Sequence, residues 1–220
     1  MKKAYALFDF DGTLISGDSI WRFCWYAHSQ GLCSFSALWQ GVQAGVQYFF
    51  KRSTAEESKQ AALAFLAGRN RAELAALSQS FCEKVLCPRL RKKAIAELEA
   101  RKGEGAEVLL ITASPAFYLE PMKGLLGIIE VIGTRMDFDS EGKATGLLGE
   151  NCKGLQKPLR LAEYLAATDG RLDYESSYAY GDSASDMPML ALCGHKLGVN
   201  PKPELKKCLR EAEGASLVRW

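Results

Sequence analysis

The chain has 220 residues, of which 48% are hydrophobic and 25% charged, and its formal net charge at pH 7 is +2. These values are typical of a globular protein with one core, or with a core that carries an inserted lid. A charge this close to neutral gives no footprint of a nucleic-acid-binding protein. The seven cysteines are scattered, odd in number and without a CxxC pair, which argues against a disulfide framework and against a zinc site.

The N-terminal residues Met1-Lys2-Lys3 run straight into an apolar segment and lack the long apolar stretch and cleavage site of a signal peptide. The sequence contains no apolar stretch near the roughly 18 residues that a membrane-spanning helix needs. We therefore expect a reduced, cytoplasmic protein.

The first predicted strand, residues 4–8, ends in Asp9-Phe10-Asp11-Gly12. A continuous apolar run is typical of a buried parallel strand, and open α/β sheets place their ligands at the carboxyl ends of such strands. The alternation of side chains along a strand would point Asp9 and Asp11 to one side, and Gly12 would allow a sharp turn. Two carboxylates in this position indicate a metal site or an acid–base pair rather than an ordinary surface turn.

A long helical stretch follows, over residues 17–102. Apolar residues at helical spacing predict helices near residues 20–27, 35–50, 54–66 and 71–86, and residues 89–102 have the pattern of a charged helix. Ser16 or Asp18 can cap the first of these helices, and Thr54 with Glu57 forms a capping-box pattern.

The second half of the chain alternates between strands and helices. We expect strands at 107–112, 128–134, 177–182 and 196–200, the last being the final strand, and a hairpin over 136–148. Helices are predicted at 115–126, 158–167 and 186–193, the first two beginning with proline. This order predicts an α/β protein with a Rossmann-like parallel sheet and helices on both faces.

Three of the predicted strands end in polar groups, and neighbouring strand ends meet in one crevice of such a sheet. These groups are Asp9-Phe10-Asp11-Gly12-Thr13-Leu14, Ile111-Thr112-Ala113-Ser114 and Gly181-Asp182-Ser183-Ala184-Ser185-Asp186, with a lysine near residue 157. With these motifs the chain resembles the haloacid dehalogenase (HAD) superfamily, in its phosphoserine-phosphatase-like subfamily IB. The resemblance covers essentially the whole chain.

The resemblance implies a phosphatase in which Asp9 is the nucleophile and forms an aspartyl-phosphate. Mg²⁺ would bind Asp9, Asp182 and the backbone carbonyl of Asp11, with Asp186 holding a metal-bound water or orienting its neighbours. The Asp11 side chain would protonate the leaving alkoxide and then accept a proton from water.

Phosphate would bind to the Thr112 hydroxyl and to the turn that contains Ala113 and Ser114, near Gly12. The phosphate-site lysine is Lys157 or Lys153, and the spacing from Thr112 and to Asp182 favours Lys157. For Asp186 the alternative is an ordinary helix N-cap.

The helical stretch matches the position of this subfamily's cap, a lid that sets specificity. We assign residues 17–88 to the cap and residues 1–16 with 89–220 to the catalytic core. Asp18 stands where phosphoserine phosphatases carry a glutamate that reads the substrate's amino group, so it is a candidate substrate-binding residue. Its shorter side chain puts phosphoserine in doubt as the substrate.

The cap is rich in aromatic residues, namely Trp21, Phe23, Trp25, Tyr26, Trp39, Tyr48, Phe49 and Phe50. They can line an apolar pocket, touch a membrane or pack a small bundle, and we favour packing because aromatic residues at helical spacing usually belong to a core.

The sequence thus predicts a Mg²⁺-dependent phosphomonoesterase for a small phosphorylated metabolite. Three alternatives stay open: a phosphatidylglycerophosphate phosphatase at the membrane surface, a phosphotransferase that uses an alcohol in place of water, and a non-catalytic phosphate-binding or regulatory module.

Overall fold

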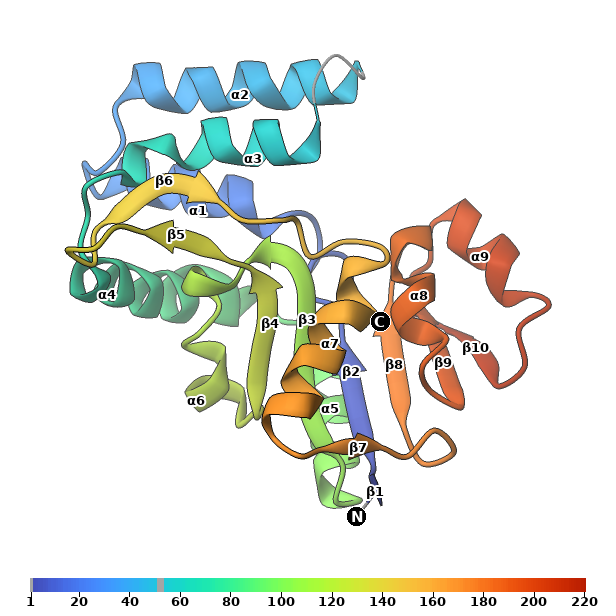
Figure 1. Ribbon diagram of the computed structural model, residues 1–220. Coiled ribbons are helices and arrows are strands. Elements are labelled where there is room, and N and C mark those ends of the chain that lie inside the picture. The colour runs from blue at the N-terminus through green and yellow to red at the C-terminus, as the bar shows by residue number, and fades with distance from the viewer. Residues whose placement is uncertain (1, 51–53) are drawn as a thin grey trace.

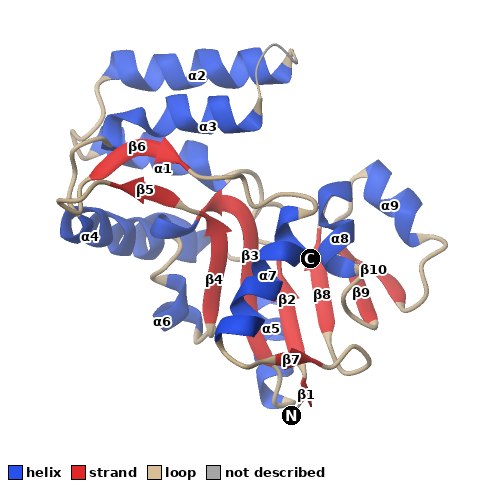
Figure 2. Cartoon of the chain, viewed as in Figure 1, coloured by secondary structure: helices blue, strands red, loops and turns tan. Residues whose placement is uncertain are grey.

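A six-stranded, fully parallel sheet forms the centre of the molecule (Figures 1 and 2). It is seen in a computed structural model that describes residues 2–50 and 54–220. The strand order is β10-β9-β8-β2-β3-β4. The strands are β2 (Tyr5–Phe8), β3 (Glu107–Pro115), β4 (Glu130–Thr134), β8 (Tyr178–Gly181), β9 (His195–Val199) and β10 (Ala215–Val218). Phe8 pairs in register with Leu110 of β3 and Tyr180 of β8, so the residues that follow these strands meet at one edge.

Both faces of the sheet are covered by helices because successive side chains of a strand point to opposite sides. Tyr5 and Leu7 pack on one face, in the cluster that includes residues of α7 (Gln156–Ala167), α8 (Met187–Leu190) and α9 (Pro203–Leu209). Ala6 and Phe8 pack on the other face, toward α5 (Lys92–Gly103), α6 (Met122–Leu126) and the helices near the N-terminus. The predicted Rossmann-like α/β fold with helices on both faces is confirmed.

Four helices form a layer above the carboxyl edge of the sheet (Figure 1). They are α1 (Ser19–Ser29), α2 (Phe35–Phe49), α3 (Ala55–Leu63) and α4 (Arg71–Phe81). The capping box of Thr54 and Glu57 at the start of α3 is confirmed, with hydrogen bonds of 3.1 and 2.7 Å. The helix predicted to reach residue 86 continues past α4 as a short π-helical segment, Cys82–Leu86.

A hairpin from the second half of the chain leans on this helical layer. It consists of β5 (Met136–Phe138) and β6 (Ala144–Leu148), as the sequence predicts. The Gly68 amide donates to the Ala144 carbonyl at 2.8 Å, and the Ala144 amide donates to the Arg69 carbonyl at 2.8 Å. The hairpin therefore contacts the cap although it follows β4 in the chain. A cap limited to residues 17–88 stays a prediction.

Two predicted helices are shorter than expected. The prediction of one helix over 115–126 is wrong, because β3 continues to Pro115, a 3₁₀ turn follows, and only α6 is α-helical. Pro121 lacks an N–H group, and its ring would clash with a carbonyl one turn earlier in a continuous helix. The helix over 186–193 is reduced to α8, which follows a 3₁₀ turn at Ala184–Asp186.

The strand at 196–200 is not the final one, because α9 and β10 follow it. β10 extends the sheet beyond β9, in parallel. It is an edge strand of four residues with no fully buried side chain, so its sequence lacks the apolar run that identifies the inner strands. The remaining pair, β1 (Lys2–Lys3) and β7 (Arg171–Leu172), lies below the sheet and was also not predicted.

The prediction that the cap aromatics mainly pack is wrong for three of them. Phe23 and Tyr26 are buried, whereas Trp25, Trp39 and Phe50 are 58%, 54% and 66% exposed. Trp25 lies off the stripe of α1 that Ile20, Phe23, Cys24 and Ala27 bury. In α2, packing is through small residues and Leu38, so Trp39 falls on another face. Tyr48 and Phe49 lie outside the side chains that the structure describes. Among the described residues, the structure has no helix long and apolar enough to cross a bilayer.

Candidate active site

The carboxyl edge of the sheet brings the predicted motif residues together. Asp9 follows β2 directly, and its amide donates to the Tyr180 carbonyl of β8 at 2.9 Å. Gly12 has a positive φ of 84°, and a Cβ atom there would collide with the Asp182 carboxylate. Glycine at this position therefore lets the turn after β2 approach the end of β8 closely.

A buried lysine links two of the aspartates. Lys157 Nζ donates to Asp9 Oδ1 at 2.7 Å and to Asp186 Oδ1 at 2.6 Å, and all three side chains are nearly inaccessible to solvent. Burial alone would lower the pKa of Lys157, but Asp9 and Asp186 raise it above the usual lysine range. Lys157 thus carries a fixed positive charge against Asp9. It lies inside the first turn of α7, which begins at Gln156, two residues before the predicted helix start at Pro158.

Asp186 does more than cap a helix. Its Oδ2 accepts hydrogen bonds from the Asp182 amide at 3.2 Å, the Ser183 amide at 3.0 Å and the Ser183 hydroxyl at 2.9 Å. Burial raises the pKa of Asp186, yet Lys157 and these donors outweigh burial and hold it below the usual range. Asp186 therefore orients both Lys157 and the turn that presents Asp182.

Asp9, Asp182 and Asp186 form a group that could hold a metal ion. One carboxylate oxygen from each lies within 4.8 Å of the others, and all three residues are buried. Lys202 Nζ contacts Asp182 Oδ2 at 2.7 Å from a side chain that is 61% exposed. Carboxylate oxygens are the ligands that Mg²⁺ prefers, and clustered buried carboxylates need cationic charge, so this donor set fits the ion.

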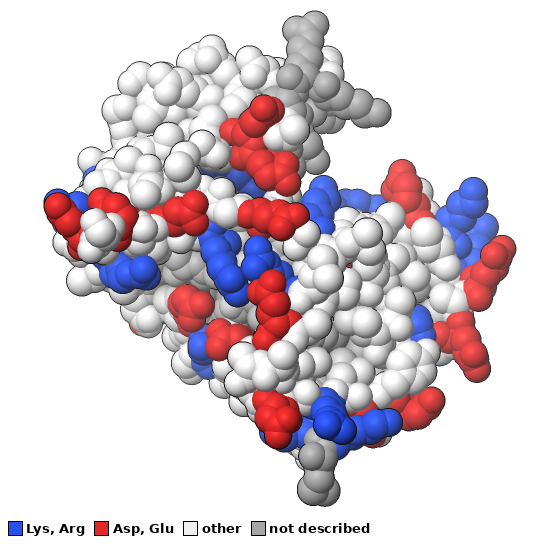
Figure 3. Space-filling view, in the orientation of Figure 1, with Lys and Arg blue, Asp and Glu red and all other residues white. Residues whose placement is uncertain are grey.

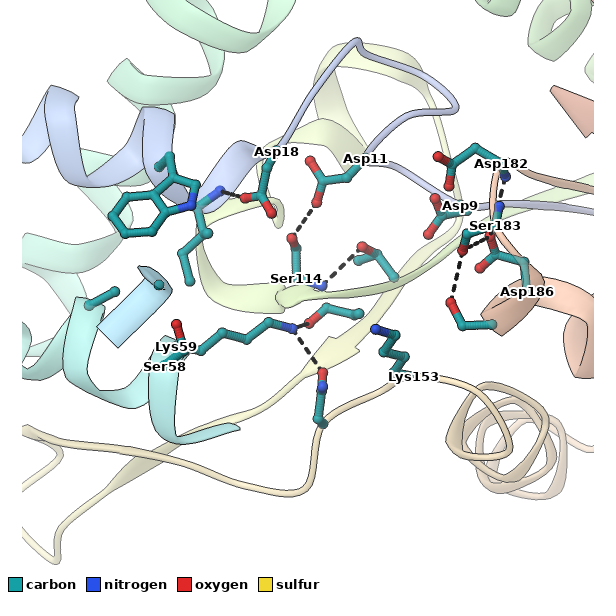
Figure 4. A pocket seen from close by; sticks show the side chains of 18 of the residues that line it. Asp9, Asp11, Asp18, Ser58, Lys59, Ser114, Lys153, Asp182, Ser183 and Asp186 are labelled. Atoms are coloured by element: carbon teal, nitrogen blue, oxygen red, sulfur yellow. Dashed lines mark hydrogen bonds between the residues drawn. The ribbon is translucent and has the colours of Figure 1, made fainter. Parts of the chain in front are cut away.

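The Asp11 carboxyl faces away from that group (Figure 4). Its Oδ1 accepts a hydrogen bond from the Ser19 amide at 2.7 Å, and its Oδ2 accepts from the hydroxyls of Ser19 and Ser114. Burial and the nearby charge of Asp18 raise the pKa of Asp11 to about 6, although these donors favour the ionised form. Burial also raises the pKa of Asp9, to about 8, against the opposing effect of Lys157.

The end of β3 supplies polar groups to the same cavity. Thr112 is buried, and its hydroxyl accepts a hydrogen bond from the Ser114 amide at 3.0 Å. Thr112, Ala113 and Ser114 all line the cavity. The two candidate phosphate-site lysines differ in their position in the cavity. Lys157 contacts Asp9, whereas Lys153 is an exposed lining residue whose side chain points into the cavity (Figure 4).

Asp18 both caps a helix and lines the cavity. It is the N-cap of α1, where Oδ1 accepts from the Ile20 amide at 2.9 Å, and it also lines the cavity. Lys59 of α3 faces it across the cavity (Figure 4).

Lys59 is a site residue that the sequence reasoning missed. Its Nζ donates to the Ala113 carbonyl at 2.6 Å and to Asn151 Oδ1 at 2.9 Å, joining the cap to the phosphate-binding turn predicted at the end of β3. Burial lowers the pKa of Lys59 to about 8, although Asp18 and Asp11 act in the opposite direction. Lys202 and Asn151 were missed as well. No motif signal marks any of the three, because each reaches the site through tertiary packing.

A cavity of about 1040 Å³ connects these groups. Core residues from the strand ends line one part of it, and residues of α1, α2 and α3 line the other. Figure 3 shows the hollow between the helical layer and the core, with charged side chains at its rim. A site of this shape can bind an anion beside buried carboxylates and enclose the group attached to it.

The family model of haloacid dehalogenase-like hydrolases matches residues 6–191. The chain therefore belongs to this family of hydrolases. One relative is protein CicA of Caulobacter vibrioides, 33% identical over 191 residues that cover 86% of this chain and 82% of CicA. Two others are named for their activity. Histidinol-phosphatase of Neisseria meningitidis is 29% identical, with 95% of this chain and 96% of that protein covered. Phosphoserine phosphatase SerB1 of Mycobacterium tuberculosis is 30% identical, with 94% and 68% covered.

Solved structures agree with this placement. A Bordetella pertussis protein of unknown function has a TM-score of 0.88 at 26% identity, with 99% of both chains covered. A phospho-aspartyl intermediate analogue of phosphoserine phosphatase shares the fold, with a TM-score of 0.62 at 20% identity over 99% of this chain and 93% of that one. The protein is thus a phosphatase of the phosphoserine-phosphatase-like group. The alternative of a non-catalytic module is set aside.

Proposed function

We propose that the protein is a Mg²⁺-dependent phosphomonoester hydrolase that forms an aspartyl-phosphate on Asp9. The observation that carries this proposal is that two carboxyls in one cavity have different hydrogen-bond partners. Asp9 is buried against Lys157 at the end of β2, while Asp11, two residues later, is held separately by Ser19 and Ser114. One carboxyl is thereby fitted to attack phosphorus and the other to transfer protons.

In the first step, an Asp9 oxygen attacks phosphorus, and the bond from phosphorus to the ester oxygen breaks. The electron pair of that bond goes to the leaving oxygen, which takes a proton from Asp11. In the second step, water attacks phosphorus and gives a proton to Asp11, and the bond between phosphorus and Asp9 breaks. Inorganic phosphate is released, and both carboxyls return to their starting forms. Lys157, Thr112 and the amides of the turn at residues 113–114 would hold the phosphate oxygens during both steps.

Asp9, Asp182 and the Asp11 backbone carbonyl would hold Mg²⁺, with Asp186 orienting the Asp182 turn. When bound, the ion would supply positive charge to the phosphate and to Asp9, which would lower the pKa of Asp9 and leave Asp11 as the proton donor. Without the ion, burial raises the pKa of Asp9 more than that of Asp11. The proposed roles need the reverse order of the two pKa values, which the charge of the ion would favour.

The substrate in this proposal is a small phosphorylated metabolite. Relatives named histidinol-phosphatase and phosphoserine phosphatase support a low-molecular-weight monoester. Two sequence-based assignments are part of the same proposal. Residues 17–88 act as the cap that sets specificity, and the reaction takes place in the cytoplasm.

The test is hydrolysis of p-nitrophenyl phosphate by the purified protein with Mg²⁺ and with EDTA, beside the Asp9→Asn variant. We expect metal-dependent release that falls by about 10⁴-fold or more in Asp9→Asn, as for other removed nucleophiles. The variant should remain folded by circular dichroism, because asparagine can still accept from Lys157. Equal activity in the folded variant would rule out Asp9 as the nucleophile, and equal activity in EDTA would rule out the metal dependence.

A further inference from the structure

The cavity has an apolar end that the phosphate chemistry does not use. Its described lining residues there come from α1, α2 and the residue after α2. They are Ile20, Trp21, Trp25, Val42, Val46 and Phe50. The sequence of α2 contains no charged residue, and Figure 3 shows little charge on the upper part of the cap, where this helix lies. An apolar wall beside an anion site is suited to the organic part of an ester.

Two glycines of α2 let this helix pack closely, Gly45 against the Trp21 indole and Gly41 against α3. A Cβ atom on Gly45 would lie 2.5 Å from Trp21 Cζ2, and a Cβ atom on Gly41 would lie 3.2 Å from the Ala62 Cα of α3. These glycines let α2 approach both the indole and α3 closely. Trp21 is half-buried, packs closely against Gly45 and still lines the cavity, so this packing restrains an indole that a ligand can reach.

Asp11, the proposed proton donor, lies next to the helix that begins this apolar wall. The Asp11 carboxyl is hydrogen-bonded to the amide and hydroxyl of Ser19, and Ile20 and Trp21 are the next two residues of the same helix. Asp11 must protonate the leaving oxygen, so that oxygen lies on the Asp11 side of the phosphorus atom. The carbon attached to it then extends toward the first turn of α1, where the apolar wall begins.

We propose that the preferred substrates are phosphate monoesters of compact alcohols with an aromatic or otherwise apolar group, which packs against Trp21 and the Val42–Val46 face of α2. This inference rests on the function proposed above and names its substrate class. Trp21 is the residue that determines the preference, because a flat ring stacked on a fixed indole gains attraction beyond its buried area.

The test compares 2-phenylethyl phosphate with ethyl phosphate, whose leaving alcohols have similar acidity, so that their ratio of kcat/KM reports on the ring alone. We expect a preference of at least about tenfold for the phenylethyl ester in the wild type. Trp21→Ala should reduce the ratio to near one, and Trp21→Phe should restore part of it. Val46→Asn places an amide on the same wall at a half-exposed position, and it should lower the ratio even if Trp21→Ala fails to fold.

Trp39→Ala is the matched control. Trp39 is a 54% exposed tryptophan of the same helical layer that does not line the cavity, so its removal should leave the ratio unchanged. A wild-type ratio near one, or an equal fall in Trp39→Ala, would overturn the inference while leaving the hydrolase intact. Turnover of phosphatidic acid in phosphatidylcholine vesicles without a preference between the short esters would overturn it in favour of a lipid surface. Loss of all turnover, including that of p-nitrophenyl phosphate, would instead contradict the proposed function.

Discussion

The two ends of the cavity are built in different ways. At the core end, Asp9, Lys157 and Asp186 are buried and joined by hydrogen bonds of 2.6–2.7 Å, and each follows or faces the end of a sheet strand. At the cap end, Trp21, Trp25 and Val46 present apolar surface from helices, and two of these side chains are more than half exposed. Charge at the core end requires fixed partners, because an unpaired buried charge is costly, whereas apolar contacts at the cap end tolerate change. In the proposed function, the reaction would thus be specified by a few rigid residues, and the substrate by a surface that can vary.

The largest difference between the two ends is expected in their contributions to stability, and Lys157 tests the core end. Lys157→Met removes the positive charge between two buried carboxylates, so the free energy of unfolding should fall by about 3–5 kcal/mol. Urea denaturation of the purified variant measures this change. Asp186→Asn in the Lys157→Met background should recover part of the loss, since it removes the Asp186 charge that Lys157 no longer neutralises.

Lys153→Met is the control for that experiment, because Lys153 lies on the same cavity but is exposed. Its removal should change the free energy of unfolding by no more than about 0.5 kcal/mol. Equal losses for Lys153→Met and Lys157→Met would show that the core end is not held together by the buried ion pairs.

A smaller effect is expected at Lys59, where the two ends meet. Lys59 is cationic below a pKa of about 8 and neutral above it, so its attraction for a phosphate dianion is lost as the pH rises through that value. The kcat/KM of the wild type, which reports groups of the free enzyme, should therefore fall above about pH 8. We expect kcat/KM to fall by about 10–100-fold, the effect of losing one charge-assisted hydrogen bond to the phosphate.

Variants at Lys59 test whether this residue causes the decline of kcat/KM near pH 8. Lys59→Met should have a low kcat/KM without the decline near pH 8, and Lys59→Arg should extend the plateau to higher pH because arginine stays protonated. If Lys59→Met kept the wild-type decline, the titrating group would lie elsewhere, and Lys59 would act only as a link between the cap and the core.

The core end was predictable because its residues follow strands whose burial pattern is plain in the sequence. The run before Asp9 and the run before Thr112 are continuously apolar, which fixes both strands and therefore the shared edge. The order of strands and helices then predicts a parallel sheet, as observed. β10 escaped prediction because a short, partly exposed edge strand carries no such pattern.

The cap end was less predictable because helical spacing does not say which neighbour covers a face. Lys59 is one lysine among many in the sequence, and only the approach of α3 to Ala113 and Asn151 brings it into the site. Trp25 is exposed because it lies off the stripe of Ile20, Phe23, Cys24 and Ala27, whereas Phe23, two residues earlier, is fully buried. The small residues Gly41 and Gly45, which decide how α2 packs, give no sign in a single sequence of the indole beside them.

If Asp9 carries the phosphoryl group during the reaction, it should be possible to trap the group there. In Asp11→Asn, p-nitrophenyl phosphate can still react at Asp9, because p-nitrophenolate leaves without a proton, while water attack lacks its base. Acid quenching this variant with Mg²⁺ and locating the phosphoryl group by peptide mass spectrometry should place it on Asp9, with none trapped in the Asp9→Asn, Asp11→Asn double variant. A phosphoryl group on another residue, or p-nitrophenolate release through many turnovers with no phosphorylated protein at any time, would show that Asp9 is not the nucleophile.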